Sequence, residues 1–564
     1  MNAPTPLLKP GPADEQPMSP EVGASLLPRA SGWWLGRMYR RLRNRFPGLP
    51  PRLARSTGRL PPAVWQVVAL LPALMFVVVV LSPPLNHDVA AVLNFAQRWV
   101  AGEALYTDLI DVNPPLIFVL NLLPAAIAAW TPIDAVVALQ ICLLALGAAC
   151  WRLCAVLRRD MAEGPAERAA LNALIPLALV VAGYDWGQRE VIMASCALPY
   201  CVLAARRMQG LPTPALPRYA TALLAAVGFA LKPHFLGVPA IIELLVLVHA
   251  GPIRAFRDPV PWVLAGVWTL YLASIPLLFP DYFGYVVPLV WSYYLDLGGL
   301  GPWRIFLGED MGEATLLLLF LLPLCLRRRA GPLAWALMAA MLGALVSAWV
   351  QHKGWTYHVA PILMLGGVLG GLLGARWLDA ALPIERARRV APVMAALAAC
   401  FVAVFVVRGG EAPFRQIHFE GTKAGRLTTW LRREAYGERL LILTPDIFPA
   451  YPALNYANAQ STLRTMNLWL LQGVYRTCPE NGARYRQPWE MSRAEFFVYR
   501  TVAEDFANAP PAAVLITRNP GIPWCGREFD FVEYFSRHPL FAAAWANYRQ
   551  EGEIEGYKLY VREQ

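Results

Sequence analysis

Long apolar runs separated by short polar stretches occupy the chain from about residue 62 to residue 407. A helix needs about twenty mainly apolar residues to cross the hydrocarbon core of a membrane. The pattern therefore predicts a polytopic α-helical membrane protein with about 11–13 transmembrane helices. The candidate spans are 62–82, 134–157, 171–183, 190–205, 218–235, 236–250, 261–279, 313–326, 332–350, 358–375 and 390–407.

Arginine clusters between these spans predict how the chain is threaded, because short basic loops stay in the cytoplasm. With the N-terminus inside, the pattern needs an odd number of full crossings, and the C-terminal region then faces outward. A further apolar segment, 114–130, fits only if it does not cross fully or if another crossing accompanies it. The clusters lie at 158–159, 206–207, 254 with 257, 327–329, and 386 with 388–389.

Composition and charge narrow the class of protein. Of the 564 residues, 57% are hydrophobic, which indicates a membrane protein rather than a soluble one. The net charge of +11 is spread over many short loops, so nucleic-acid binding is disfavoured. Residues 1–61 are expected to form a basic cytoplasmic segment. Its stretch WWLGRMYRRLRNRF either lies on the anionic inner leaflet or belongs to a disordered tail.

The pattern changes from residue 408 onward. ERLLILTPD and AAVLITRNPG predict buried strands that end in turns, and GYKLYVRE predicts a closing strand. We therefore expect a soluble α/β domain over 408–564, after a transmembrane domain over 62–407. Cys478 and Cys525 lie in this polar region and could form a disulfide outside the cytoplasm, while the other seven cysteines fit small apolar residues.

Four carboxylates and a histidine follow the first predicted span, in NHDVAAVLNFAQRWVAGEALYTDLIDVNPPL. These residues are His87, Asp88, Glu103, Asp108 and Asp111, in a chain of which only 16% is charged. The residues after Asp88 predict a short helix, so Asp88 stands where an N-cap is expected. The N-cap is the more common role of such a residue, and the functional alternative is a general base at the membrane surface; the two roles do not exclude each other.

Asp108 and Asp111 are three residues apart, so on a helical turn they would share a face. Two close carboxylates could bind a divalent cation such as Mg²⁺ or Mn²⁺, or raise one another's pKa. The alternative is a solvated acidic turn before the helix that starts at the Pro-Pro pair. Tyr106 and Asn113 add hydrogen-bonding groups suited to a sugar or a phosphate.

Several basic side chains stand close to the predicted outer membrane boundary. Arg189, Lys232 and Lys353 need a partner or a function there, because charges at such positions are costly. A phosphate or diphosphate would be such a partner. Each residue alone is typical of an interfacial side chain that reaches water, but together they predict an anion site, with His234, His352 and His358 as further donors. The threading gathers GYDWGQRE (183–190), LKPHF (231–235), QHKGWTYH (351–358) and the aromatic loop 281–310 on one outer face.

The outward acidic loop that ends in a Pro-Pro-Leu helix start resembles the GT-C glycosyltransferase superfamily. It is most similar to the branch of glycosyltransferase family 39 that includes protein O-mannosyltransferases and the lipid A aminoarabinose transferase. The resemblance covers the architecture of most of the chain, but its motifs lie only at about 86–116. GYDWGQRE, LKPHF and KGWTYH look like motifs of a bacterial subgroup. Two departures stand out, since Asn113 replaces a common lysine and His87-Asp88 replaces an Asp-Glu pair.

The resemblance implies a multi-pass enzyme of the bacterial inner membrane. It would move a hexose or pentose from a polyprenyl-phosphate donor to a lipid, glycan or protein acceptor on the extracytoplasmic face. Asp88 would be the catalytic base of an inverting displacement, and the phosphate role would pass from the missing lysine to the basic residues. The implied substrate-binding residues are His87, Tyr106, Asp108, Asp111, Asn113, Arg189, Lys232, His234, Lys353, Tyr357 and His358.

Two other functions remain open from the sequence. A transporter or flippase of a lipid-linked or anionic substrate could use the same boundary charges. However, the polar residues gather on one face instead of the bilayer midplane, and no internal repeat is visible. An envelope polysaccharide polymerase or ligase would share the substrates without needing the acidic first loop.

Overall fold

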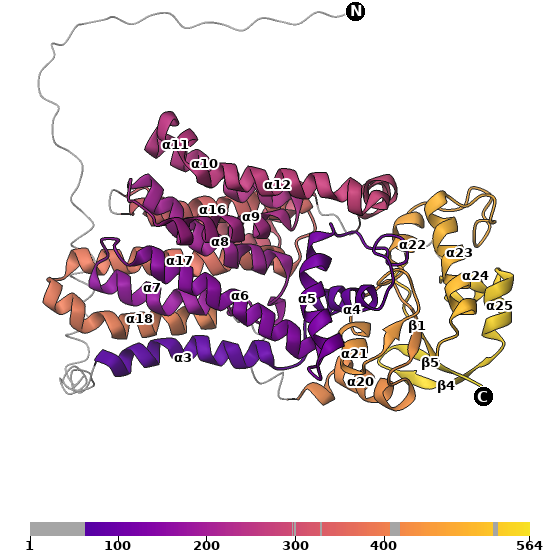
Figure 1. The fold of residues 1–564 in the computed structure, drawn as a ribbon. Helices are drawn as coiled ribbons and strands as arrows, with labels where there is room; N and C mark the ends of the chain where they lie inside the picture. Colours follow the sequence, from indigo (N-terminus) through magenta and orange to yellow (C-terminus); the bar gives the residue numbers. More distant parts are fainter. Residues whose placement is uncertain are drawn as a thin grey trace, which may run out of the picture. The chain divides into compact units, whose positions relative to one another are not determined.

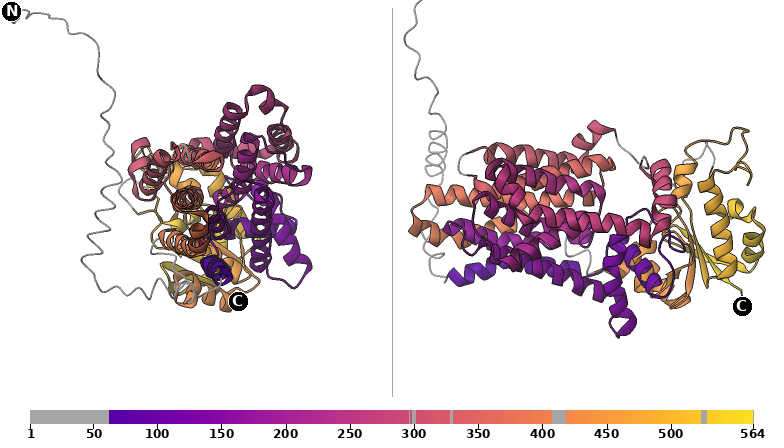
Figure 2. Two further views of the ribbon diagram at one scale, coloured as in Figure 1. Left: turned by 90° about the vertical axis from the view of Figure 1, so that its left-hand side faces the viewer. Right: turned by 45° about the horizontal axis from the view of Figure 1, so that its top comes forward.

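The computed structural model describes residues 62–295, 297, 301–327, 330–406, 418–522 and 528–563. The basic segment expected over 1–61 lies outside the described residues, so its predicted role stays a prediction. The remainder, Pro61–Gln564, is one compact unit. Helices of its first part run alongside one another, and a small sheet lies beyond one end of them (Figures 1 and 2).

Every predicted apolar run lies largely on one helix. Within the described ranges, eight helices are long and apolar enough to cross a membrane, by length and composition. The remaining runs form shorter helices, among them α5 at 15 residues, which spans only about 22 Å. The helices are α3 (Pro62–Leu81), α5 (Leu116–Trp130), α6 (Ala135–Arg158), α7 (Pro165–Ala178), α8 (Arg189–Met208), α9 (Ala215–Ala230), α10 (Gly237–Ala250), α12 (Pro259–Leu278), α15 (Glu309–Cys325), α16 (Gly331–Gln351), α17 (Thr356–Ala381) and α18 (Ile384–Val406).

Three of these helices form the centre of the bundle. Most of α8, α16 and α17 is buried inside the protein, whereas α3, α6, α10, α12 and α18 leave most of their length exposed to the surroundings. Small residues allow the close contacts in the centre. At Gly343 of α16, an added Cβ would lie only 2.5 Å from the Cα of Val238 on α10, so a larger residue would push the two helices apart.

Short elements connect the spans. The segment after α3 contains α4 (His87–Val100), and α4 and α5 lie at the end of the bundle that faces the sheet (Figure 1). The others are η2 (Gly183–Asp185), η3 (Pro233–Leu236), α11 (Pro252–Arg257), η4 (Tyr282–Val286), α13 (Val287–Leu289), η5 (Val290–Tyr294), α14 (Pro302–Leu307) and η6 (Phe419–Gly421).

The C-terminal region contains the predicted α/β structure. Its five-stranded sheet has the order β2-β1-β3-β5-β4, with β2, β1 and β3 parallel and β5 and β4 antiparallel. The three predicted strands are confirmed as β1, β3 and β5. The strands are β1 (Arg439–Leu443), β2 (Gln460–Ser461), β3 (Ala513–Thr517), β4 (Tyr548–Ile554) and β5 (Tyr557–Arg562), and the helices are α20 (Lys423–Glu434), α21 (Ala450–Tyr456), α22 (Trp469–Val474), α23 (Arg493–Asn508), α24 (Phe531–Ser536) and α25 (Pro539–Trp545).

The side chains of β1 alternate between two hydrophobic cores, one shared with the helical bundle and one within the C-terminal region. Leu440 and Ile442 belong to a core that continues through α20 and α21 into the helical bundle. Leu441 and Leu443 face the opposite layer, which is formed by α22 to α25. Because successive side chains of a strand point to opposite faces, a strand made only of apolar residues serves both layers.

The two polar-region cysteines differ in what the structure describes. Cys478 is disulfide-bonded. Cys525, its expected partner, lies outside the described residues. The other seven cysteines are free, as expected for small apolar residues of the bundle.

Candidate active site

Asp88 lies in the first turn of α4 rather than at its N-cap. The cap is Asn86, whose side-chain oxygen accepts hydrogen bonds from the backbone N–H groups of Asp88, at 3.0 Å, and Val89, at 3.5 Å. The expectation that Asp88 caps the helix is therefore wrong, because an equally good capping residue precedes it by two positions. The carboxylate of Asp88 is left available for other contacts.

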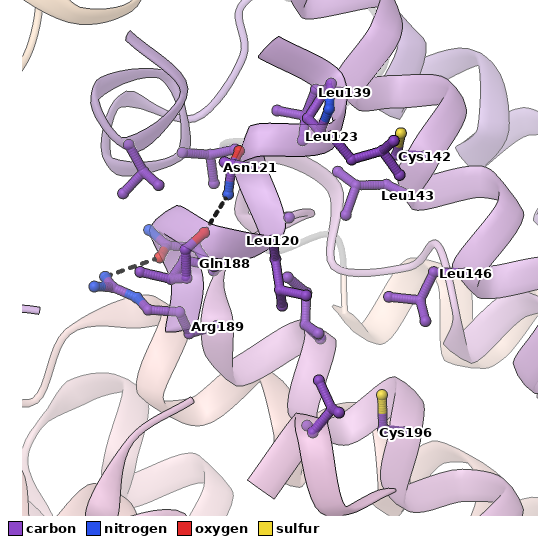
Figure 3. Close-up of a pocket in the computed structure, with 18 of the residues that line it drawn as sticks. Leu120, Asn121, Leu123, Leu139, Cys142, Leu143, Leu146, Gln188, Arg189 and Cys196 are labelled. Carbon is purple, nitrogen blue, oxygen red and sulfur yellow. Dashed lines mark hydrogen bonds between the residues drawn. The ribbon is translucent and has the colours of Figure 1, made fainter. Parts of the chain in front are cut away.

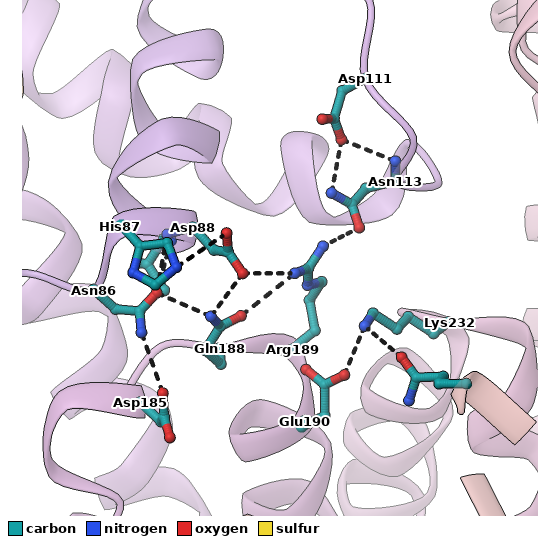
Figure 4. Close-up of polar contacts among 12 residues, drawn as sticks. Asn86, His87, Asp88, Asp111, Asn113, Asp185, Gln188, Arg189, Glu190 and Lys232 are labelled. Carbon is teal, nitrogen blue, oxygen red and sulfur yellow. Dashed lines mark hydrogen bonds and ion pairs between the residues drawn. The ribbon is translucent and has the colours of Figure 1, made fainter. Parts of the chain in front are cut away.

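Polar contacts of Asp88 join the starts of α4 and α8 (Figure 4). Gln188 Nε2 donates to Asp88 Oδ2 at 3.0 Å and to Asn86 Oδ1 at 2.9 Å. Arg189 Nη2 lies 3.7 Å from the same Asp88 oxygen, and His87 Nε2 lies 3.7 Å from the other. The Asp88 side chain keeps 17% of its surface exposed, so a ligand can still reach it.

Arg189, the first residue of α8, also binds the end of the acidic loop. It donates to the side-chain oxygen of Asn113 and, at 3.4 Å, to Gln188 Oε1. Asn113 in turn donates from its backbone and side-chain nitrogens to Asp111 Oδ1, at 2.8 and 2.7 Å. Burial raises the pKa of Asp111, although these bonds and the Arg189 guanidinium oppose the rise.

Asp108 does not join this cluster. The loop from 103 to 115 is not helical, so the prediction that Asp108 and Asp111 share a helical turn is wrong. Asp108 is exposed and accepts a bond from Ala104 N–H at 2.9 Å. Among the described residues, no group of three or more His, Cys, Asp or Glu side chains is arranged to hold a metal ion. A role for Mg²⁺ or Mn²⁺ stays a prediction.

Tyr106 shapes the loop from inside. Only 2% of its surface is exposed, its ring packs against Tyr282 and Phe279, and its hydroxyl donates to the carbonyl of Asn113 at 2.5 Å. Its backbone is in the left-handed region, with φ of 68°. The predicted contact between Tyr106 and a substrate would need this hydroxyl, which the fold already uses.

Lys232 forms a buried ion pair with a residue that the sequence reading missed. Its Nζ lies 2.6 Å from Glu190 Oε1 and 3.1 Å from Gln351 Oε1, and it faces the rings of Phe235 and Tyr357. Burial lowers the pKa of Lys232 to about 8, against the opposing effect of Glu190. The contact joins GYDWGQRE, LKPHF and QHKGWTYH, three of the stretches that were predicted to converge. Their position on the outer face stays a prediction.

Lys353 is the buried cation that has no hydrogen-bond partner among the described residues. Its side chain is buried at 8% exposure, with Nζ 3.2 Å from the centre of the Tyr294 ring and 4.8 Å from the Trp355 ring. Burial lowers its pKa to about 7, and the neighbouring Lys232 and Arg189 lower it further. An unpaired buried ammonium is costly, so the surroundings of Lys353 favour an anionic ligand.

The predicted histidines differ in their placement. His358 is 2% exposed and stacks on Trp355, and neither of its ring nitrogens has a partner in the described part of the chain. His234 is half-buried, with its Nε2 likewise unpaired. His87 contacts the hydroxyl of Tyr184 through Nδ1 at 2.9 Å. His352 ends α16 in a left-handed conformation.

An apolar groove of about 230 Å³ starts at Asp88, Gln188 and Arg189. It is lined by α4, α5, α6, α8 and α9, and Figure 3 shows lining residues from α5, α6 and α8. Leu120 and Leu123 of its wall are exposed on the surface that would face lipid. A long apolar chain can therefore enter from the side and place a polar end beside Asp88. Its other walls include Val92, Ile117, Leu139, Cys142, Leu143, Leu146, Ile192, Cys196, Leu224 and Gly228.

The site thus contains residues that were not selected from the sequence. Asn86, Gln188 and Glu190 bind the selected residues directly. Two of them belong to GYDWGQRE, a stretch that the threading already placed on the outer face.

The sequence matches no protein-family model and no curated protein. The structure is similar to two crystal structures of ArnT from Cupriavidus metallidurans, one bound to undecaprenyl phosphate and one in the apo state. The TM-scores are 0.52 and 0.53, at 11% sequence identity, over 88% of this chain and 97% of the ArnT chain. ArnT is a GT-C glycosyltransferase, the lipid A aminoarabinose transferase. This structural similarity confirms the GT-C type of fold, which the sequence of the loop at 86–116 had led us to expect.

Proposed function

We propose that this chain is a membrane glycosyltransferase that moves a sugar from a polyprenyl-phosphate carrier to an acceptor hydroxyl on the extracytoplasmic face. The observation that carries the proposal is a carboxylate, Asp88, at the polar end of an apolar groove and beside buried cations. A base next to a lipid-sized groove is suited to a reaction in which one substrate is anchored in the membrane.

The donor assignment rests on the chemistry of the groove and of the basic residues. An isoprenoid chain is apolar and flexible, and the groove offers it walls of leucine, isoleucine and valine. Its phosphate needs fixed cations. Lys353 is unpaired and buried, and Arg189 and Lys232 lie close enough to influence its charge. The undecaprenyl phosphate bound to the structurally similar ArnT supports the same class of donor.

The proposed step is a single displacement at the anomeric carbon. Asp88 takes the proton of the acceptor hydroxyl, whose oxygen forms the new glycosidic bond. The bond between the anomeric carbon and the phosphate oxygen breaks at the same time, and polyprenyl phosphate leaves with the electron pair. Arg189, Lys232 and Lys353 stabilise the growing negative charge. One displacement inverts the anomeric configuration.

Neighbouring groups would hold the base in position. Gln188 fixes one oxygen of Asp88, and His87 lies beside the other. Asn113, held by Asp111, ties Arg189 to the end of the acidic loop. We assign catalysis to the membrane domain over 62–407 in the inner membrane and place the C-terminal domain over 408–564 on the outer side, next to the site.

Transfer and lipid retention test the proposal together. The purified chain should retain polyprenyl phosphate or its glycosylated form in mild detergent, as measured by mass spectrometry. Asp88→Asn should keep the lipid but lose roughly 10²–10⁴-fold in transfer rate, because the base is missing. Asp281→Asn, which changes an exposed carboxylate of the same outer face, is the matched control.

Either of two results would contradict the proposal. If Asp88→Asn transferred the sugar at the wild-type rate, Asp88 would be excluded as the catalytic base. Uptake of a lipid-linked substrate into sealed vesicles, with no glycosyl transfer in detergent, would favour a transporter.

A further inference from the structure

A second cavity, of about 250 Å³, lies where α4, α5 and α6 meet the C-terminal region. Its walls continue those of the apolar groove. Helix α5 lines the groove with residues from 117 to 124 and the second cavity with residues from 125 to 129. Helix α6 lines the groove from 139 to 146, and its first two residues, with the N-cap Asp134, line the cavity. The two cavities are therefore neighbours along the same pair of helices.

Four side-chain amides face this cavity, which we call the amide pocket. Gln97 comes from the last turn of α4, and Asn455, Asn458 and Gln460 come from α21 and the segment after it. No hydrogen bond joins the amide groups of Gln97, Asn458 or Gln460 to another residue within the described ranges. Asn455 is 8% exposed and donates to the carbonyl of Ala90 at 3.0 Å, but its Oδ1 is unpaired.

The rest of the lining consists of one carboxylate, Asp134, and apolar residues, namely Val100, Ile133, Val136 and four alanines. Asp134 uses Oδ1 to cap α6, accepting from Val136 N–H at 2.8 Å, so its other oxygen remains available. Ala125, Ala128 and Ala129 form one face of α5 and leave the space open. Among the residues that the structure describes, no lysine, arginine or aromatic residue lines the pocket. Its volume is also far above the roughly 10–15 Å³ that one water molecule needs.

We infer that the amide pocket binds a neutral oligosaccharide portion of the acceptor. An amide offers both donors and acceptors, which matches a hydroxyl group that is itself both. Because no cation lines the pocket and one carboxylate does, phosphates and uronates are disfavoured. That the bound sugar belongs to the acceptor rests on the proposed transferase function. The binding of a neutral sugar in the amide pocket does not depend on that function.

The distance between the base and the amide pocket bears on the size of the acceptor. Asp88 and Gln97 are nine residues apart on α4, which places their backbones about 14 Å apart along the helix axis. A single sugar cannot reach from the base to the amide pocket. An acceptor that occupies both places would therefore be longer than one sugar.

Saturation-transfer NMR on the full chain in detergent tests the inference without any transfer reaction. The probes are neutral tetrasaccharides of glucose, mannose, galactose or rhamnose, with tetragalacturonate as the anionic comparison. At least one neutral probe should bind, and the double variant Gln97→Ala/Gln460→Ala should bind it roughly 10-fold more weakly, since two neutral hydrogen bonds are lost. Gln550→Ala, an exposed amide on β4, should bind like wild type.

Each outcome separates the inference from the proposed function. Asp88→Asn should still bind the neutral probe, so loss of transfer in that variant does not affect this test. The inference is overturned if no neutral probe binds, if the double variant binds as well as wild type, or if tetragalacturonate binds equally. In the last case the pocket does not select neutral sugars.

Discussion

The unpaired ammonium of Lys353 makes a prediction in which stability and activity change in opposite directions. In the protein without ligand, Lys353 is buried between Tyr294 and Trp355 and has no hydrogen-bond partner among the described residues. Its positive charge therefore destabilises the fold unless an anion is bound. Lys353→Met keeps an unbranched side chain of similar length and removes the charge.

The size of the effect follows from the pKa. Burial lowers the pKa of Lys353 from 10.5 to about 7, which corresponds to about 5 kcal/mol against the ammonium form. The contacts with the two aromatic rings offset roughly 2 kcal/mol of this. A net cost of about 3 kcal/mol remains near pH 6.5. Since the folded protein binds the proton more weakly than the unfolded chain, the cost shrinks as the pH rises toward 10.5.

Thermal unfolding of the delipidated protein measures this difference. Lys353→Met should unfold a few degrees above wild type at pH 6.5, and the gap should fall by about half or more at pH 9.5. The same variant should lose most of its bound polyprenyl phosphate and most of its transfer activity. Lys558→Met, at an exposed position of β5, should change neither property. An unfolding temperature for Lys353→Met at or below that of wild type at pH 6.5 would refute the reasoning, and so would unchanged lipid retention.

Lys232→Ala leaves the Glu190 carboxylate buried without its ion-pair partner, so this variant should lose roughly 3–5 kcal/mol of stability. In thermal unfolding, the double variant Lys232→Ala/Glu190→Gln should recover part of this loss, because the unpaired charge is removed. Asn86→Ala removes the cap of α4, should cost about 1 kcal/mol and should also slow transfer. Asn86→Ser keeps a capping oxygen and adds no charge beside the buried Asp185 carboxylate, so it should restore part of the stability; equal stability of the alanine variant would show that the cap is unimportant. Protease added to spheroplasts should cleave within 418–563, and sealed inside-out vesicles should protect the same region; the reverse result would invert the proposed orientation.

The helices and the main strands could be predicted because they have a local apolar signal. The runs that became α12 and α16 are apolar over their whole length, and length alone separates them from strands. β1 and β3 are short apolar runs because both of their faces are covered. β4 was missed, since its sequence YRQEGEI is mostly exposed and polar, and only its pairing with β5 defines it as a strand.

The site was predicted in part, and the missing part has a common physical cause. A charge in an apolar stretch is rare and costly, so Arg189, Lys232 and Lys353 stand out in the sequence before any contact is known. A neutral amide at a helix end is ordinary, so neither Gln188 nor the residues of the amide pocket give a comparable signal. Their partners also lie far away in sequence, as when Gln188 binds Asp88 across 100 positions. In a membrane protein of this kind, sequence patterns therefore reveal the groups that carry charge, and the fold is needed to reveal the groups that would recognise a neutral sugar.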